Sequence, residues 1–397
     1  FLEQGPFLEW QNSLYFTGAS KAQQCQDCHM PEPAAGTYQT RIATRPDGTV
    51  NTQWPERSPF YTHSMVGGNA YLLELLRDNR VALEIGNSTT VAGFDEKIAE
   101  TRAFLSSSAA DLAVTQAVVA GVDALIDVRI TNKTGHKLPT GYPSRRMWLH
   151  VTVRDAANQV IFESGAPNAQ GEISTDTTRL ATDCLARTKP PGFVNGSCYE
   201  LHRDVITLPS QVAIYETVLG DTNDDITHVL LHANSYLKDN RIPPKGFTLG
   251  QADVIEPQTK PAGVGADPDF NFENGGEGSG SDTVHYRVTL NDPDDSHSVS
   301  VRLLYQPIQP AFIDGLHATG TQVTSFKQMV AASPPGAELL ASANAVIGVA
   351  GAAGSGGGGC ALGRGGRPDP LFPALLLVAT AWLGLRRRQP GPHREQK

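Results

Sequence analysis

The residues with the most specific chemistry are Cys25-Gln26-Asp27-Cys28-His29. Two cysteines separated by two residues and followed by histidine form the attachment signature of a c-type haem. Each thiol adds to one porphyrin vinyl group, and the histidine becomes an axial iron ligand. The chain has no second CxxC that would complete a zinc site, and a thioredoxin-like redox pair would have no need of His29. The pattern therefore predicts one covalent haem c, held by Cys25, Cys28 and His29.

The second axial position needs another neutral imidazole or a thioether. His63 is the first choice, because it lies in the segment that follows the motif and just before the glycine pair Gly67-Gly68. His136, in a Thr-Gly-His turn, is the second choice. The remaining candidates are, in order, His202, His228 and His232, with Met30 and Met65 as thioether alternatives. Arg145 and Arg146 are expected to meet haem propionates or strand-edge carboxylates, with surface salt bridges as the equally weighted alternative.

Composition narrows the class of protein. The 397 residues carry 41 acidic and 32 basic side chains, a net charge of -9, which argues against a nucleic acid as partner. The 39 glycines and 27 prolines favour loops and β-structure over a helical bundle. The sequence begins with Phe1 rather than Met, so we expect a processed chain or a fragment.

Three further cysteines bear on the compartment. Cys184 and Cys198 flank a Pro/Gly-rich loop, a spacing that suits a local disulfide in an oxidising compartment; two free thiols are the alternative. Cys360 stands in a Gly-rich segment and is a candidate for processing or lipid attachment. Haem attachment and a disulfide together indicate a location outside the cytoplasm.

Hydrophobic periodicity divides the chain. Residues 1–110 predict a small helical and loop haem domain, with Asn69 as a helix cap and a second helix over about 95–107. Residues 111–320 change to a period of two and predict an antiparallel, Ig-like β-sandwich, so the fold class is α+β. Within it, the Gly/Pro/acid-rich stretch 257–281 is expected to be a loop. Residues 321–359 predict a weakly helical segment and a Gly-rich linker.

Residues 360–397 predict a C-terminal sorting and membrane-anchor segment. The apolar run from Leu371 to Leu385 precedes Arg386-Arg387-Arg388. As a helix it would measure about 22 Å, short of a hydrocarbon core of about 30 Å, although flanking arginines can extend it. The arginines would stay cytoplasmic and place the preceding domains outside. The tail resembles the tripartite sorting signals of bacterial surface proteins, whereas a buried soluble helix is the alternative.

Five strings resemble multihaem c-type cytochromes of the cytochrome c554-like family. They are CQDCHMP together with RSPFYTHSMVGGN, then NKTGHKLPTGYPSRRMWLHVTV, YELHRDVITLPSQVAIYE and YLKDNRIPPKGF, which begin at residues 25, 57, 132, 199 and 236. The resemblance implies the C-terminal portion of such a protein. Members usually carry several CxxCH motifs and this chain has one, so either further haems lie upstream or this is a reduced member.

These features favour electron transfer outside the cytoplasm by a cytochrome tethered to a membrane or cell surface, in the periplasm or on the surface of a bacterium. Its expected partners are redox proteins and other haem subunits. Two alternatives stay open. One is a haem enzyme, or subunit of one, acting on a small nitrogen or sulfur oxide at an open iron site. The other is a surface-binding β-sandwich with a structural haem.

Overall fold

The computed structural model describes residues 2–18, 20–31, 45–49, 51–55, 61–86, 89–173, 199–316 and 320–349. All of them belong to one compact unit, Phe1–Ala352. Its helices are α1 (Pro6–Gln11), α2 (Leu14–Thr17), α3 (Cys25–His29), α4 (Ala70–Asp78), α5 (Val91–Ser108), α7 (Leu249–Ile255), α8 (Pro310–Asp314) and α9 (Thr321–Ala332), with 3-10 turns η1 (Leu230–His232) and η2 (Pro257–Thr259).

The strands form one large curled sheet in the order β5-β10-β2-β1-β12-β11-β3-β6-β7, with β4 paired to β3 and a separate β8-β9 hairpin. Their bounds are β1 (Ala110–Ala120), β2 (Asp123–Asn132), β3 (Arg146–Arg154), β4 (Val160–Ser164), β5 (Val205–Ile206), β6 (Ile214–Gly220), β7 (Ser235–Asp239), β8 (Phe272–Glu273), β9 (Gly276–Glu277), β10 (Ser281–Thr289), β11 (His297–Gln306) and β12 (Glu338–Val349).

The predicted two-sheet sandwich is therefore only partly right. The side chains of β2 and β10 on one half of the curled sheet share a hydrophobic core with those of β3 and β11 on the other half. However, β12 joins the halves into one sheet, pairing antiparallel with β11 and, at Gly348 and Val349, parallel with β1. The sheet is mixed, since β5 also pairs parallel with β10. Together with the helices it makes the fold mixed α/β.

The segment after residue 320 differs from the expected weak helix. Helix α9 ends at Ala332, and the Ala-rich stretch from Glu338 onward is the strand β12. This stretch fills the gap between β1 and β11, where Leu340 and Ile347 are buried. Backbone pairing on both sides and burial of these side chains outweigh the helix preference of its alanines.

Several local predictions are confirmed. Asn69 caps α4, since its side-chain oxygen accepts a hydrogen bond of 3.0 Å from the Leu72 N–H. Helix α5 covers the second predicted helix, and its Ile98 and Leu105 are buried.

The stretch 257–281 differs from the prediction. The sequence predicts a loop there, but the stretch contains η2, the β8-β9 hairpin and the first residue of β10.

The expected C-terminal anchor helix has no support. Among the described helices, none is both long and apolar enough to cross a membrane. The run Leu371–Leu385, like Cys184, Cys198 and Cys360, lies outside the described residues.

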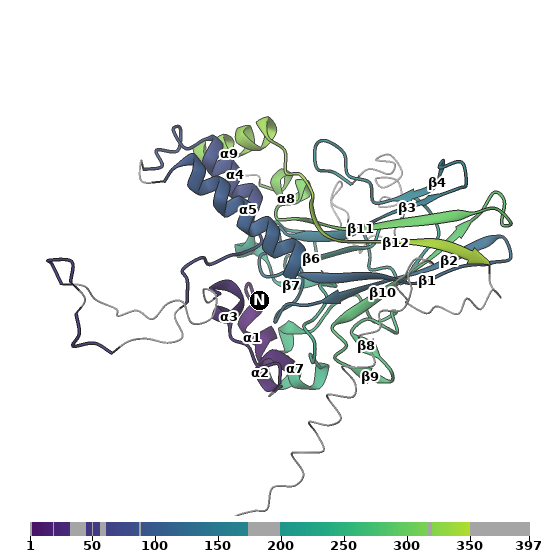
Figure 1. The fold of residues 1–397 in the computed structure, drawn as a ribbon, viewed down its shortest axis with the longest axis horizontal. Coiled ribbons are helices and arrows are strands. Elements are labelled where there is room, and N and C mark those ends of the chain that lie inside the picture. Colours follow the sequence, from purple (N-terminus) through teal and green to yellow (C-terminus); the bar gives the residue numbers. More distant parts are fainter. Residues whose placement is uncertain are drawn as a thin grey trace, which may run out of the picture. The chain divides into compact units, whose positions relative to one another are not determined.

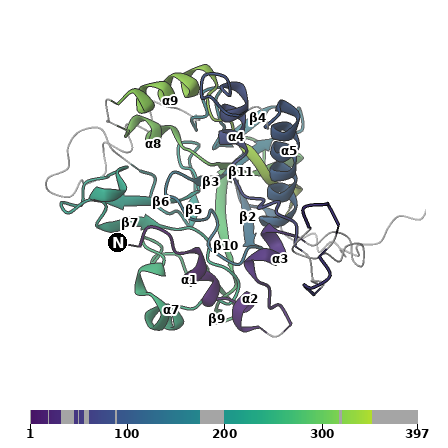
Figure 2. The same ribbon diagram turned by 90° about the vertical axis from the view of Figure 1, so that its left-hand side faces the viewer.

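The helices gather at one end of the sheet (Figure 1). Helices α4, α5, α8 and α9 lie on one side of that end, whereas α1, α2, α3 and α7 lie on the other (Figure 2). Tyr71 and Leu75 of α4 pack with Phe312 of α8 and Val330 of α9 in a second, smaller core. This arrangement brings the haem motif in α3 next to the loop that follows β2.

Candidate haem site

The haem motif forms a short helix of its own. The Gln24 N–H donates a hydrogen bond of 2.7 Å to the Asp27 carboxylate, which starts α3 at Cys25. Residues three apart lie on one face of a helix, so Cys25 and Cys28 present their side chains on the same side. Both thiols are free and exposed. The local fold thus presents two free thiols together, as attachment to two vinyl groups requires.

His29, the last residue of α3, is held in a fixed orientation. Its Nδ1 lies 2.6 Å from the Val66 carbonyl oxygen, and the Val66 N–H donates back to the His29 carbonyl at 3.0 Å. The Phe104 ring packs beside it, with ring centres 5.8 Å apart. A carbonyl can only accept, so Nδ1 carries the proton and Nε2 has a free lone pair. This is the usual orientation of a histidine that binds a metal through Nε2.

His136 lies in the tight loop after β2, and its Nδ1 also faces a backbone carbonyl oxygen. Its Nδ1 is 3.0 Å from the Lys137 carbonyl oxygen, which again leaves Nε2 as the free nitrogen. The Asn132 side chain donates to the His136 carbonyl at 2.7 Å and so closes the loop. Burial lowers the pKa of His136, and a neutral imidazole is the form that binds iron.

The His136 loop packs tightly against the N-terminal helices. The Tyr15 hydroxyl donates to the Lys133 carbonyl at 2.6 Å. A Cβ added at Gly135 would lie 3.1 Å from Cδ1 of Trp10, closer than nearly all such contacts. The residue before His136 is therefore glycine for a steric reason, and the loop has little room to move.

The rings of His29 and His136 lie nearly parallel, with an interplanar angle of 14° and centres 6.3 Å apart. A metal–imidazole bond is about 2.0–2.1 Å and a ring nitrogen lies about 1.2 Å from its ring centre, so two imidazoles on opposite sides of one metal ion have centres about 6.4 Å apart. The observed separation fits that geometry. Cys25 and Cys28 could thus attach a haem, and the spacing of His29 and His136 is that of two imidazoles that would bind one iron.

A buried ion-pair network supports the His136 loop. The Lys137 N–H donates to the Glu9 carboxylate at 2.9 Å, and Lys137 Nζ lies 2.7 Å from the Asp239 carboxylate. Arg241 also pairs with Asp239, at 2.7 Å, and with Glu9, at 3.4 Å. Facing two cations, Asp239 keeps a pKa of about 2 although its burial opposes ionisation. The network connects α1 to the His136 loop and to the segment that contains Asp239 and Arg241.

His63, the first choice for the second ligand, has no described contact with His29. Its side chain is exposed, and within the described residues no hydrogen bond or ring contact joins it to His29. Its neighbours are fixed to the motif instead: the Thr62 hydroxyl donates to the Pro31 carbonyl at 2.8 Å, and the Tyr61 hydroxyl to Asp27 at 2.9 Å. The segment around His63 therefore contributes to the site through the Val66 carbonyl, which orients His29. The sequence did not predict this role.

The other candidates are spread over the fold. His202 pairs with Asp267, and the His228 ring packs on Phe312 with centres 5.6 Å apart. His232 lies in η1, Met30 is half-buried beside His29, and Met65 is exposed.

Arg145 and Arg146 differ in their surroundings. Arg145 is close enough to His136 to act on its pKa, and its guanidinium donates to the Thr140 carbonyl at 2.8 Å. Arg146 is buried against Trp148 and donates to Gln306 at 2.9 Å, away from the haem motif. Arg145 therefore lies near His136, where its role as a propionate partner stays a prediction, whereas Arg146 packs in the core of the sheet.

No family model matches the chain, and no curated protein matches it. Among solved structures, it is similar to a penta-haem cytochrome c552 from Thermochromatium tepidum, with a TM-score of 0.36 and 16% sequence identity. The match covers 82% of this chain and 48% of that one, so the chain spans about half the length of the solved protein. At that score the likeness establishes neither a shared fold nor a shared function, and the haem assignment depends on the chain's own residues.

Proposed function

We propose that this chain is a c-type cytochrome that binds one haem through Cys25 and Cys28, with His29 and His136 as axial ligands, and that it transfers electrons. The paired geometry of His29 and His136 carries the proposal. A haem supplies a one-electron redox centre when bound. Two histidines held by backbone carbonyls, His29 and His136, would both bind the iron and would leave no position for a substrate, which favours electron transfer over the chemistry of a nitrogen or sulfur oxide.

The chain's own residues keep this site rigid. Val66 and Lys137 orient the two imidazoles through their carbonyls. Phe104 shields one side of His29, and Trp10 and Tyr15 pack on the loop of His136. A site that changes little between two oxidation states suits electron transfer, because less reorganisation accompanies each step.

The test is the visible spectrum of the purified protein together with a Cys25→Ser/Cys28→Ser double variant. We expect low-spin ferric and ferrous bands without added ligand, and haem staining on a denaturing gel that the double variant loses. Persistent staining in the variant would refute covalent attachment. High-spin ferric bands and carbon monoxide binding by the unaltered protein would instead support an enzyme with an open iron site.

Location and partners form a further part of the proposal. Covalent haem favours a compartment outside the cytoplasm, with redox proteins and other haem subunits as partners and residues 360–397 as a tether to a membrane or cell surface. Removing residues 360–397 should leave the haem spectrum unchanged and release the protein into the soluble fraction of its native host. A truncated protein that still pellets with membranes would show that the tail is not the anchor.

A further inference from the structure

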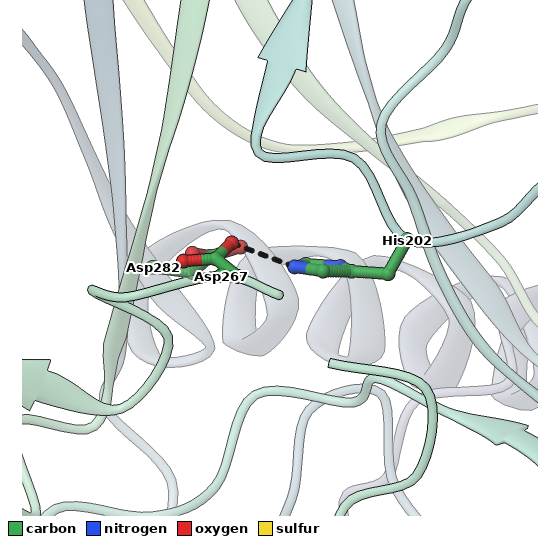
Figure 3. A group of neighbouring side chains, drawn as sticks. All are labelled: His202, Asp267 and Asp282. Atoms are coloured by element: carbon green, nitrogen blue, oxygen red, sulfur yellow. Dashed lines mark hydrogen bonds and ion pairs between the residues drawn. The ribbon is translucent and has the colours of Figure 1, made fainter. Parts of the chain in front are cut away.

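Two groups of histidine and carboxylate side chains lie outside the haem site, in the part of the chain that the structure describes. The first consists of His202, Asp267 and Asp282, whose polar atoms converge (Figure 3). The second consists of His285, Asp204 and Asp269. Such groups bind metal ions when a histidine nitrogen is left free and properly oriented, so the hydrogen-bond partners of each histidine separate the two cases.

In the first group, each ring nitrogen of His202 already has a hydrogen-bond partner. The Asn240 amide oxygen accepts the Glu216 N–H at 2.9 Å, and its nitrogen donates to the Ile214 carbonyl at 2.8 Å. This orientation directs the amide nitrogen to His202 Nδ1 at 3.0 Å, so Nδ1 accepts and the ring proton is on Nε2. That Nε2–H points at Asp267, 2.7 Å away. Both nitrogens of His202 are therefore taken up by hydrogen bonds, although Oδ1 of Asp282 is buried and finds no partner among the described residues.

In the second group the nitrogen that is fixed as the donor is Nδ1 instead. His285 of β10 lies directly opposite Asp127 of β2, and its Nδ1 donates to the Asp127 carboxylate at 2.7 Å. With Nδ1 so fixed, Nε2 faces two further carboxylates: Asp269, at a hydrogen-bond distance of 3.2 Å, and Asp204 at 3.6 Å. Burial opposes protonation, but Asp127 and Asp269 raise the pKa of His285, so Nε2 carries either a proton or a metal ion toward these carboxylates. A carboxylate that orients the far nitrogen of a histidine is the usual support of a metal-binding imidazole.

One oxygen in this second group is an independent sign of a missing cation. Oδ1 of Asp204 is buried and has no hydrogen-bond partner among the residues that the structure describes. It is also the Asp204 oxygen nearest to His285 Nε2. Leaving a buried carboxylate oxygen unsatisfied is costly, and burial raises the pKa of Asp204 accordingly. A metal ion between Nε2 and this oxygen would supply the missing interaction.

The distances suit a small divalent ion. Ligand atoms at about 2.0–2.2 Å from a tetrahedral ion are separated from one another by about 3.3–3.6 Å. The 3.2 and 3.6 Å separations around His285 Nε2 lie close to that range. We propose that His285, Asp204 and Asp269 bind a first-row divalent cation, Zn²⁺ being the reference ion, with Asp127 as the positioning residue. One nitrogen and two carboxylate ligands favour such an ion over Ca²⁺ or Mg²⁺, which prefer oxygen alone.

The site is accessible from solvent. The side chains of His285, Asp204 and Asp269 are 37%, 26% and 31% exposed, so an ion can enter and a water molecule can fill its fourth position. Asp269 comes from the stretch that precedes the β8-β9 hairpin, and Asp204 directly precedes β5, which pairs with β10 beside His285. Three separate chain segments therefore meet here.

The experiment measures Zn²⁺ binding to the haem-loaded full chain by calorimetry, after removal of bound metal with a chelator. We expect one Zn²⁺ per chain that His285→Asn or Asp269→Asn abolishes and Asp127→Asn weakens about 10- to 100-fold. Asp292→Asn removes the same charge from an exposed acidic turn and should bind as the unaltered protein does. An unchanged haem spectrum and circular dichroism in each variant establish that it is folded.

Two results would overturn the proposal. The first is Zn²⁺ binding that is absent, or that survives both His285→Asn and Asp269→Asn in folded protein. The second is loss of binding in a folded His202→Asn variant while His285→Asn still binds, which would assign the ion to the first group. Each result leaves the haem proposal untouched, because no haem ligand is altered.

Discussion

The imidazole rings of His29 and His136 lie 6.3 Å apart and within 14° of parallel, each with Nδ1 beside a backbone carbonyl oxygen. His29 ends the haem-motif helix, whereas His136 belongs to the loop after a core strand of the sheet. The haem proposed here would therefore join the N-terminal helical segment to the β-structure through its two axial bonds. Loss of either ligand should change both the iron spectrum and the stability of that junction.

The first prediction concerns the second axial ligand. Replacing His136 with alanine should shift the ferric spectrum from low spin to high spin and permit carbon monoxide binding, because it leaves one iron position open. Added imidazole should restore the low-spin bands. His63→Ala is the matched control and should keep the low-spin spectrum. The converse pattern, in which His63→Ala becomes high spin and His136→Ala does not, would assign the ligand to His63.

The second prediction concerns the buried ion pair behind His136. Lys137→Met removes the cation at 2.7 Å from Asp239, in a pair whose side chains are 0% and 1% exposed. Removing one partner of a buried pair leaves an uncompensated charge and should lower the free energy of unfolding by about 3–5 kcal/mol, measured by urea denaturation. Arg77→Ala, which breaks exposed pairs with Asp78 and Asp95, should cost about 0–1 kcal/mol. A similar cost for both variants would contradict a structural role of the network.

The third prediction concerns pH and Asp282. Burial raises the pKa of Asp282 well above its usual range, with Asp267 adding to the effect, while the Tyr215 hydroxyl donates to it at 2.6 Å. The folded protein therefore keeps a proton that the unfolded chain releases near pH 4, so this residue lowers stability as pH rises above that value. Asp282→Asn has no such proton to lose. It should be more stable than the unaltered protein at pH 7, by about 1.4 kcal/mol for each unit by which the pKa is raised.

Urea denaturation of both proteins across pH 3 to 7 checks this prediction. The stability advantage of Asp282→Asn should shrink as pH falls and vanish below about pH 4, where the unfolded chain is also protonated. An advantage that is independent of pH would show that the substitution acts through packing rather than ionisation.

The fourth prediction is the disulfide between Cys184 and Cys198, which lie outside the described residues. Closing a loop of about 15 residues should contribute about 3 kcal/mol in the chain-entropy model. Mass spectrometry of a non-reduced digest should find the two peptides linked. Full alkylation of both cysteines without a reductant would refute the bridge.

The sequence alone determined the local features. The CxxCH spacing defines thiols on one helical face followed by a histidine, because one turn of backbone suffices to arrange them. The cap at Asn69 and the core strands β2, β3, β10 and β11 likewise follow from short-range patterns. These features involve neighbouring residues, whose relative positions the chain itself limits.

The tertiary structure decided which distant groups meet. His63 is nearer in the chain, yet His136 lies beside His29, since β2 and the packing of Trp10 and Tyr15 carry its loop there. The Ala-rich stretch from Glu338 is a strand because it pairs with β11 on one side and with β1 on the other. His285 meets Asp204 and Asp269 only because strand pairing and the stretch before β8 bring them together. Short-range patterns cannot specify such meetings, because the sheet's register and the packing of the whole core determine them.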